Sequence, residues 1–207
     1  MPLPTAARPG RPLALLASQP VFVVAVAACA LGYGVMNLLM AATPIAMAMC
    51  SHPFANTALV LEWHVLGMFV PSFFTGNLIR RFGAVRVMAA GVVLNGVCIA
   101  VALSGVELER FLVALFTLGV GWNFLFIGGT SLVTTAYRPE EKTRAQAAMD
   151  TTIFTTMTIT SFSSGALVTT QGWTWLNLGS IVPVLLTAFA LAWYAAHRRA
   201  DLRTRPV

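Results

Sequence analysis

The chain has 207 residues, of which 57% are hydrophobic and 10% are charged, and its formal net charge is +6. Its mean hydropathy is +0.78. Ordinary soluble domains contain about 45–50% apolar and about 25% charged residues, so the composition excludes that class. The basic residues lie in short clusters between apolar runs and not on one amphipathic face, which argues against a nucleic-acid partner. The cysteines (Cys29, Cys50, Cys98) form no CxxC pair and have no metal-ligand spacing, so we expect neither a metal nor a cofactor.

Long stretches without charged residues predict an all-α integral membrane protein. A transmembrane helix needs about 20 predominantly apolar residues, and the longest stretch without a charged residue runs over 151–197. The expected spans are six transmembrane helices at about residues 20–44, 58–79, 86–105, 110–135, 146–169 and 174–195. They form a bundle over 20–197, between a flexible, Pro- and Ala-rich cytoplasmic tail at 1–19 and a basic cytoplasmic tail at 198–207.

The basic residues also predict the orientation of this bundle. If both termini are cytoplasmic, twelve of the 13 Lys and Arg residues lie on the cytoplasmic side, and only Arg110 lies outside. An excess of Lys and Arg in cytoplasmic loops is the rule for membrane proteins. We therefore expect a multi-pass protein with both termini in the cytoplasm.

The segment 76–86 (GNLIRRFGAVR) concentrates Arg80, Arg81 and Arg86 within seven residues. Glycine reaches positive φ without steric cost, so Gly76 and Gly83 let helices end and the backbone reverse. The segment resembles the loop signature of the major facilitator superfamily, Gly-x-x-x-Asp-Arg-x-Gly-Arg-Arg, which follows the second helix of each six-helix half. Gly76, Arg81 and Gly83 match this signature, whereas Arg80 stands where the family usually has Asp.

Two further features extend the resemblance. The loop 137–145 (YRPEEKTRA) is similar to a turn often found between helices four and five of a facilitator half. The first and fourth expected spans share a weak echo, LGYG at 31–34 and LGVG at 118–121. These spans run in opposite directions, as in the two inverted three-helix repeats of a facilitator half. The chain thus resembles the carboxyl-terminal six-helix half of a facilitator.

The two loops carry opposite charges that can meet at the cytoplasmic surface. The expected ion pairs join Arg81 or Arg86 to Glu140 or Glu141. In the family, the signature Asp helps to latch the closed state. Because Arg80 occupies that place here, we expect the latch to be altered.

The resemblance implies secondary active transport of a small solute by alternating access, as symport or antiport, in a bacterial inner membrane. It also implies a partner, either a second six-helix half or another copy of the chain. The runs Glu62–Phe69 and Gly121–Gly129 resemble bacterial members linked to riboflavin uptake. The alternative is a truncated or split-gene membrane fragment without transport activity. No nucleotide-binding loop, metal-ligand spacing or catalytic constellation occurs in the sequence, so we expect no enzyme.

Four residues near mid-membrane are the candidate substrate-binding residues: Tyr33, Asn37, Trp122 and Asn123. By the resemblance, the first, second, fourth and fifth spans line the substrate. Polar side chains at such depth usually face a bundle interior or a wet cavity. The aromatic rings can stack on a planar ligand while the amides hydrogen-bond to it. The alternative is ordinary packing, with each Asn bonded to a neighbouring helix.

Glu62 and His64 are the candidate proton-coupling residues. Glu62 is the one acid well inside an apolar run, although it lies close enough to the outer end to reach the interface. His64 titrates near neutrality when unperturbed. The two point about 200° apart on a helix, so they cannot share one cavity. The serines and threonines of 151–164 form either a polar cavity wall or hydroxyls bonded to carbonyls four residues back.

Overall fold

The computed structural model describes residues 10–204, with side chains described as far as residue 200, and every regular element within them is helical. The helices are α1 (Leu13–Ala17), α2 (Pro20–Met49), α3 (Phe54–Phe69), α4 (Ser72–Phe82), α5 (Ala84–Leu103), α6 (Leu108–Val133), the 3₁₀ helix η1 (Pro139–Glu141) and α7 (Lys142–Thr204). In this part of the chain, five helical stretches are long and apolar enough to cross a membrane. They are Pro20–Met49, Phe54–Phe82, Ala84–Leu103, Leu108–Val133 and Pro139–Ala200. The predicted all-helical membrane architecture is therefore confirmed.

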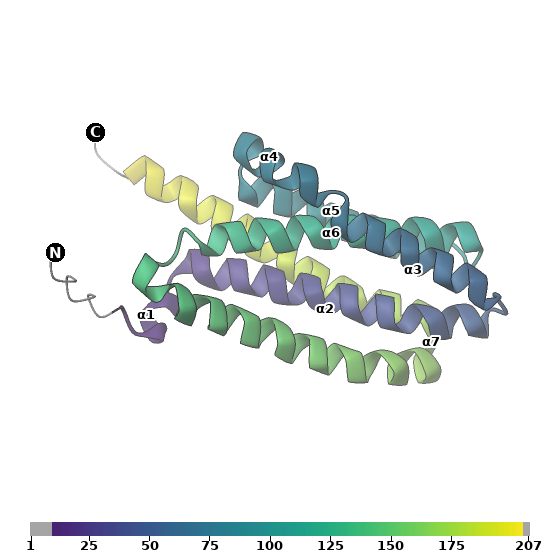
Figure 1. The fold of residues 1–207 in the computed structure, drawn as a ribbon. Coiled ribbons are helices and arrows are strands. Elements are labelled where there is room, and N and C mark those ends of the chain that lie inside the picture. Colours follow the sequence, from purple (N-terminus) through teal and green to yellow (C-terminus); the bar gives the residue numbers. More distant parts are fainter. Residues whose placement is uncertain (1–9, 205–207) are drawn as a thin grey trace, which may run out of the picture.

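The longest helix, α7, folds back on itself. Gly172 has φ 81° and ψ 172°, which are not helical values, and the α7 ribbon reverses direction at the right-hand end of the bundle (Figure 1). A positive φ of this kind favours glycine, because a Cβ there is strained. We call residues 142–171 the first arm of α7 and residues 173–204 the second arm. Gly172 lies inside the connection expected between the fifth and sixth spans.

The second expected span is broken where one continuous helix was predicted. α3 ends at Phe69 and α4 begins at Ser72, with Pro71 between them. Proline has no backbone N–H and its ring clashes with the preceding turn, so it interrupts the helical ladder. The Thr75 hydroxyl oxygen lies 2.8 Å from the Pro71 carbonyl oxygen at this break.

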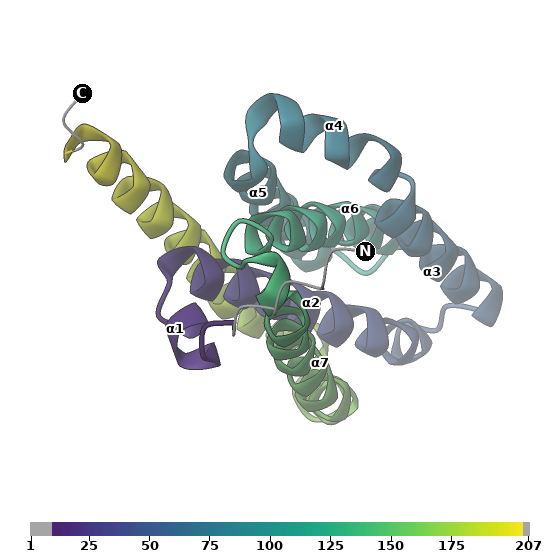
Figure 2. The ribbon, with the colours of Figure 1, turned by 60° about the vertical axis from the view of Figure 1, so that its left-hand side comes forward.

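Helix α2 lies at the centre of the bundle. Figures 1 and 2 place it between α6 and the first arm of α7, and it packs against both. Its buried side chains, among them Leu39 and Met47, join α6 and α7 residues in one apolar core. A second apolar core joins the beginning of α2 to the ends of α6 and α7.

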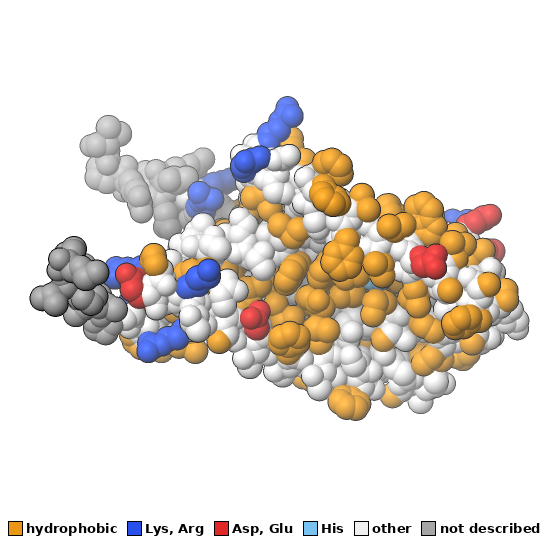
Figure 3. Space-filling model, in the orientation of Figure 1, with side chains coloured by type: hydrophobic (Ala, Val, Ile, Leu, Met, Phe, Trp, Pro, Cys, Tyr) orange, Lys and Arg blue, Asp and Glu red, His pale blue; other side chains and the backbone are white. Residues whose placement is uncertain are grey.

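The terminal segments are more structured than the expected tails. Residues 13–17 form α1, whose Leu16 is fully buried, and α7 remains helical to Thr204. The remainder of both predicted tails, residues 1–9 and 205–207, lies outside the described residues. α1, the α4–α5 turn, η1 and the end of α7 all lie at one end of the bundle (Figure 1). Lys and Arg side chains gather toward that end, and apolar side chains cover the middle (Figure 3).

Candidate functional site

An aromatic cluster joins α2 to α6 at half their length. It consists of Tyr33, Trp122 and Phe126, and Tyr33 is the fourteenth of the 30 residues of α2. The Tyr33 and Trp122 rings meet edge to face with centroids 5.1 Å apart, and Trp122 stacks on Phe126 at 5.1 Å. Tyr33 and Phe126 meet edge to face at 5.7 Å. Sequence reasoning missed Phe126, although its i+4 spacing from Trp122 places both on one face of a helix.

The cluster holds one polar atom that lacks a partner. The Trp122 side chain is 6% exposed, and its indole N–H makes no hydrogen bond to any residue that the structure describes. Buried donors are nearly always paired, so an unpaired one needs a reason. Tyr33 and Phe126 are partly exposed beside it. The arrangement offers apolar ring faces together with one donor, which suits a planar ligand that carries an acceptor.

Asn37 does not point into an open site, because it joins α2 to the first arm of α7. Its side-chain Nδ2 lies 3.1 Å from the Met157 carbonyl, 2.9 Å from Thr160 Oγ1 and 2.8 Å from Ser161 Oγ. With its amide group engaged in this way, the contacts of Asn37 favour the packing alternative.

Asn123 makes the corresponding contacts between α6 and the α3–α4 break. Its Nδ2 donates to the Met68 carbonyl at 2.7 Å and to Ser72 Oγ at 2.6 Å, and its Oδ1 accepts from Thr75 Oγ1 at 2.6 Å. The amide thus satisfies polar groups at the break beside Pro71. These contacts also favour packing over direct ligand binding.

The two candidate proton-coupling residues lie on different faces of α3, as expected. Glu62 is exposed and borders an open apolar hollow of about 590 Å³ lined by Leu61, Val65 and other α3 side chains. Among the described residues it forms no ion pair. His64 is fully buried against α6, and its Nδ1 lies 2.7 Å from the Leu115 carbonyl.

Most hydroxyls of the first arm of α7 that form hydrogen bonds donate to carbonyls of their own helix, which is the second of the two alternatives. Thr152, Thr156, Thr158 and Ser163 each donate to the carbonyl four residues earlier, at 2.7–2.9 Å. A hydroxyl bonded in this way is satisfied within its own helix. The hydrogen-bonding capacity of these hydroxyls is therefore used largely within the helix.

The predicted loop signature spans the α4–α5 turn, but only Gly83 lies between the two helices, because residues 76–82 belong to α4 and residues 84–86 to α5. The expectation that Gly76 ends a helix is therefore wrong. Gly83 has φ 85°, in the region that favours glycine, whereas Gly76 is exposed with open space around it. Arg80 donates to the Asn77 side chain, and the Arg81 guanidinium lies 5.2 Å from the Phe82 ring centroid. Arg86 lines a cavity beside the turn.

The expected ion pair between the two loops is wrong for Glu141, which pairs with Arg11 instead. Arg11 Nε lies 2.7 Å from Glu141 Oε1, a second guanidinium nitrogen lies 2.8 Å from Oε2, and the Arg11 backbone N–H donates at 2.9 Å. The Arg138 backbone N–H donates to the same carboxylate at 2.9 Å. Hydrogen bonds from Arg11 and Arg138 hold the pKa of Glu141 far below its usual value. Arg11 reaches Glu141 because residues 10–12 lie against η1, which the sequence did not indicate.

The helical membrane architecture and the two loops are features of a class of membrane protein, and sequence comparison identifies this class directly. A sequence model of the Major Facilitator Superfamily matches residues 22–207, so the chain belongs to this family. The predicted family is therefore confirmed, and with it the multi-pass membrane character of the chain.

Three curated relatives are transporters by name. A riboflavin transporter of Brucella anthropi, RfnT, is 44% identical over 168 residues, which are 81% of this chain and 42% of that protein. The MFS-type transporters YddS and YdeG of Bacillus subtilis are 29% and 30% identical over 77% and 73% of this chain. The chain spans 42%, 37% and 36% of the lengths of these relatives. The expectation that it is not an enzyme agrees with the family and with these names.

Proposed function

We propose that the chain is the carboxyl-terminal six-helix half of a secondary transporter that works by alternating access. The observation that carries this proposal is the aromatic cluster at mid-bundle in a chain of this family. Such a transporter rocks two six-helix halves around a midplane site. The bundle over 20–197 is the transporting body in this proposal, and the segments before and after it lie in the cytoplasm.

Six membrane crossings in two inverted repeats follow if the two arms of α7 count separately. The first repeat is then α2, α3–α4 and α5, and the second is α6 followed by the two arms of α7. Asn37 joins the first helix to the fifth, and Asn123 joins the fourth helix to the second. An exchange of the two repeats turns one of these pairings into the other, which supports the repeat.

The proposed orientation has the Arg-rich end of the bundle in the cytoplasm of a bacterial cell. The α4–α5 turn and η1 both lie at this end, together with the start of α2 (Figure 1). The rule that Lys and Arg favour the cytoplasmic side supports this orientation.

The proposed substrate is a planar, riboflavin-like aromatic molecule. The relative from Brucella anthropi is named a riboflavin transporter, and the aromatic cluster offers ring faces and the Trp122 donor to a flat heterocycle. We retain Tyr33 and Trp122 as direct contacts and add Phe126. Asn37 and Asn123 are proposed to hold the helices that carry these rings.

For coupling, Glu62 is the better-placed candidate. Its carboxylate borders an apolar hollow on the exposed face of α3, where a partner half can cover it. Ionisable residues within membrane spans commonly belong to proton relays, which supports this role. The buried His64, bonded to a backbone carbonyl, is proposed to act only through helix packing.

Uptake of labelled riboflavin tests the proposal. Cells that lack their own uptake system would express the chain alone and then together with a matching amino-terminal half. We expect uptake with both halves, a loss of more than about tenfold for Trp122→Leu, and little change for Trp175→Leu, which is exposed on the second arm of α7 and outside the proposed partner face. Equal membrane levels of all variants are the control. Absence of uptake in both expression conditions would defeat the proposal and favour a fragment without transport activity.

The proposed partner is a second six-helix half or another copy of the chain. Many aromatic side chains remain exposed on α3, α4 and the first arm of α7, including Phe73 and Phe162 at 81% and 82%. Size analysis in detergent, with and without the second half, tests this part. A stable monomer that does not associate with the second half would contradict the proposed partner.

A further inference from the structure

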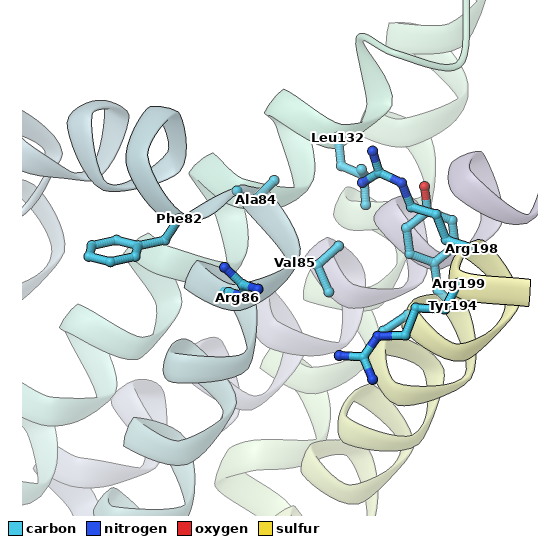
Figure 4. Close-up of a pocket in the computed structure, with 10 residues that line it drawn as sticks. Phe82, Ala84, Val85, Arg86, Leu132, Tyr194, Arg198 and Arg199 are labelled. Atoms are coloured by element: carbon cyan, nitrogen blue, oxygen red, sulfur yellow. The ribbon is translucent and has the colours of Figure 1, made fainter. Parts of the chain in front are cut away.

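A cavity of about 380 Å³ opens between the start of α5, the end of α6 and the second arm of α7. Three arginines line it: Arg86 from α5, and Arg198 and Arg199 from α7. Figure 4 shows Arg86 and the two α7 arginines on opposite sides of Val85 in that view. We call Arg86, Arg198 and Arg199 the cavity arginines. The cavity lies at the Arg-rich end of the bundle and takes no part in the proposed substrate site.

No described acid neutralises the cavity arginines. The ion pairs found among residues 10–200 are Arg11–Glu141 and Arg110–Glu107, and neither involves this cavity. All three cavity arginines are exposed. Like charges around one cavity repel one another, and an anion bound between them offsets this repulsion. The planar, forked guanidinium group matches the oxygens of a phosphate.

The inner wall of the cavity is apolar. Leu132 and Tyr194 line it, and both are buried parts of the second apolar core. Val85 and Phe82 complete this wall on the α4–α5 side. The ligand that fits must therefore present an anionic group toward the arginines and apolar surface toward the helices.

A second hollow adjoins the first. It measures about 290 Å³ and shares Phe82 and Arg86 with the cavity, and its other walls include Leu78, Ala90 and Phe124. Except for Arg86, all of its lining residues are apolar. Ala90 lies six residues beyond the start of α5, which is roughly 9 Å deeper along the helix. Arg86 therefore stands at the boundary between a charged hollow and an apolar one.

We propose that these two hollows bind one anionic phospholipid, with its phosphate at the cavity arginines and an acyl chain in the apolar hollow. A free phosphate fits the cavity but leaves the second hollow unfilled, whereas a phospholipid fills both. Basic pockets between membrane helices on the cytoplasmic side are suited to anionic headgroups. The site lies on α5 and the second arm of α7, away from the aromatic cluster, so it does not depend on the proposed substrate.

Native mass spectrometry of the purified full chain tests this assignment. The protein would be equilibrated in mixed micelles with phosphatidylglycerol or with phosphatidylcholine, and the retained lipid counted. We expect phosphatidylglycerol to be retained, and the triple Gln variant of the cavity arginines to lose retention at least about tenfold. The charge-matched control carries Arg80→Gln, Arg81→Gln and Arg144→Gln and should change retention less than about twofold. Equal losses in both triple variants would overturn the site.

Two further measurements distinguish a bound lipid from free phosphate. Ala90→Phe fills the apolar hollow while keeping every charge, and we expect it to weaken phosphatidylglycerol retention. Inorganic phosphate and glycerol phosphate, added as competitors, should not displace the lipid. Displacement by either soluble ion, or full retention in Ala90→Phe, would show that the second hollow holds no acyl chain and would overturn the proposal.

Discussion

The close contact between α3 and α6 gives the sharpest prediction about stability. A Cβ built on Gly119 lies 2.5 Å from the His64 carbonyl oxygen and 2.9 Å from the Met68 backbone nitrogen. The first distance is about 0.9 Å short of ordinary contact, and both obstacles are backbone atoms, so only separation of the helices relieves the clash. Small residues at membrane helix interfaces allow this approach. Overpacking of this kind costs about 1–3 kcal/mol, so we expect Gly119→Ala to destabilise the bundle by that amount.

Unfolding in micelles of increasing SDS content, followed by circular dichroism, measures this loss. The matched control is Gly96→Ala on α5, where an added Cβ meets nothing within 4 Å, and it should be neutral or stabilising by up to about 1 kcal/mol. Gly67→Ala faces the Phe116 carbonyl at 2.6 Å across the same contact and should resemble Gly119→Ala. The double variant should lose less than the two single losses together, because one separation relieves both clashes. Wild-type stability of Gly119→Ala would refute this reasoning.

Three other predictions address contacts that hold the helices and loops. The lowered pKa of Glu141 means that its ion pair contributes stability that is complete above the usual carboxyl pKa of about 4.5 and is lost progressively as pH falls from there toward the lowered pKa. Glu141→Gln should therefore flatten the acid limb of a stability–pH curve, and the exposed Glu140→Gln is the matched control. Asn37→Leu removes its bonds to the first arm of α7 and should cost about 0.6–1.7 kcal/mol in SDS unfolding; an unchanged midpoint would mean that these bonds add nothing. Gly172→Ala forces a Cβ into a positive-φ conformation that is essentially restricted to glycine and should cost about 1–3 kcal/mol in the same assay, whereas Gly179→Ala on the second arm should not destabilise.

Local sequence signals predicted the helices well because each span needs only its own apolar residues. The uncharged stretches gave α2, α5 and α6 to within a few residues, and the connection expected at 170–173 contains the reversal at Gly172. Pro71 was visible in the sequence, yet proline can kink a membrane helix without ending it. At the break, Asn123, 52 residues later in the chain, donates to the Met68 carbonyl, and this long-range contact is not visible in the sequence.

The partners of the polar residues could not be read from the sequence. Arg11 and Glu141 are separated by 130 positions, and their pairing depends on how residues 10–12 lie against η1. The depth of Asn37 in its span was predictable, but its three acceptors on α7 depend on which helix packs beside α2. Helical periodicity determines on which face of a helix a residue lies, whereas tertiary packing determines which residues it contacts. The same limit explains why Phe126 was missed beside Trp122.

The positions of the two asparagine bridges bear on how the proposed transporter would move. Asn37 joins α2 to the first arm of α7, and Asn123 joins α6 to the α3–α4 break, so in the proposed repeat each bridge links one repeat to the other. The Gly119 contact adds a backbone-to-backbone approach beside the second bridge. Sliding of one repeat past the other would break interhelical hydrogen bonds in a medium that offers no water to replace them. The least costly motion keeps the bundle intact and displaces it as a unit against the proposed partner. In that case alternating access would take place at the exposed faces of α3, α4 and the first arm of α7.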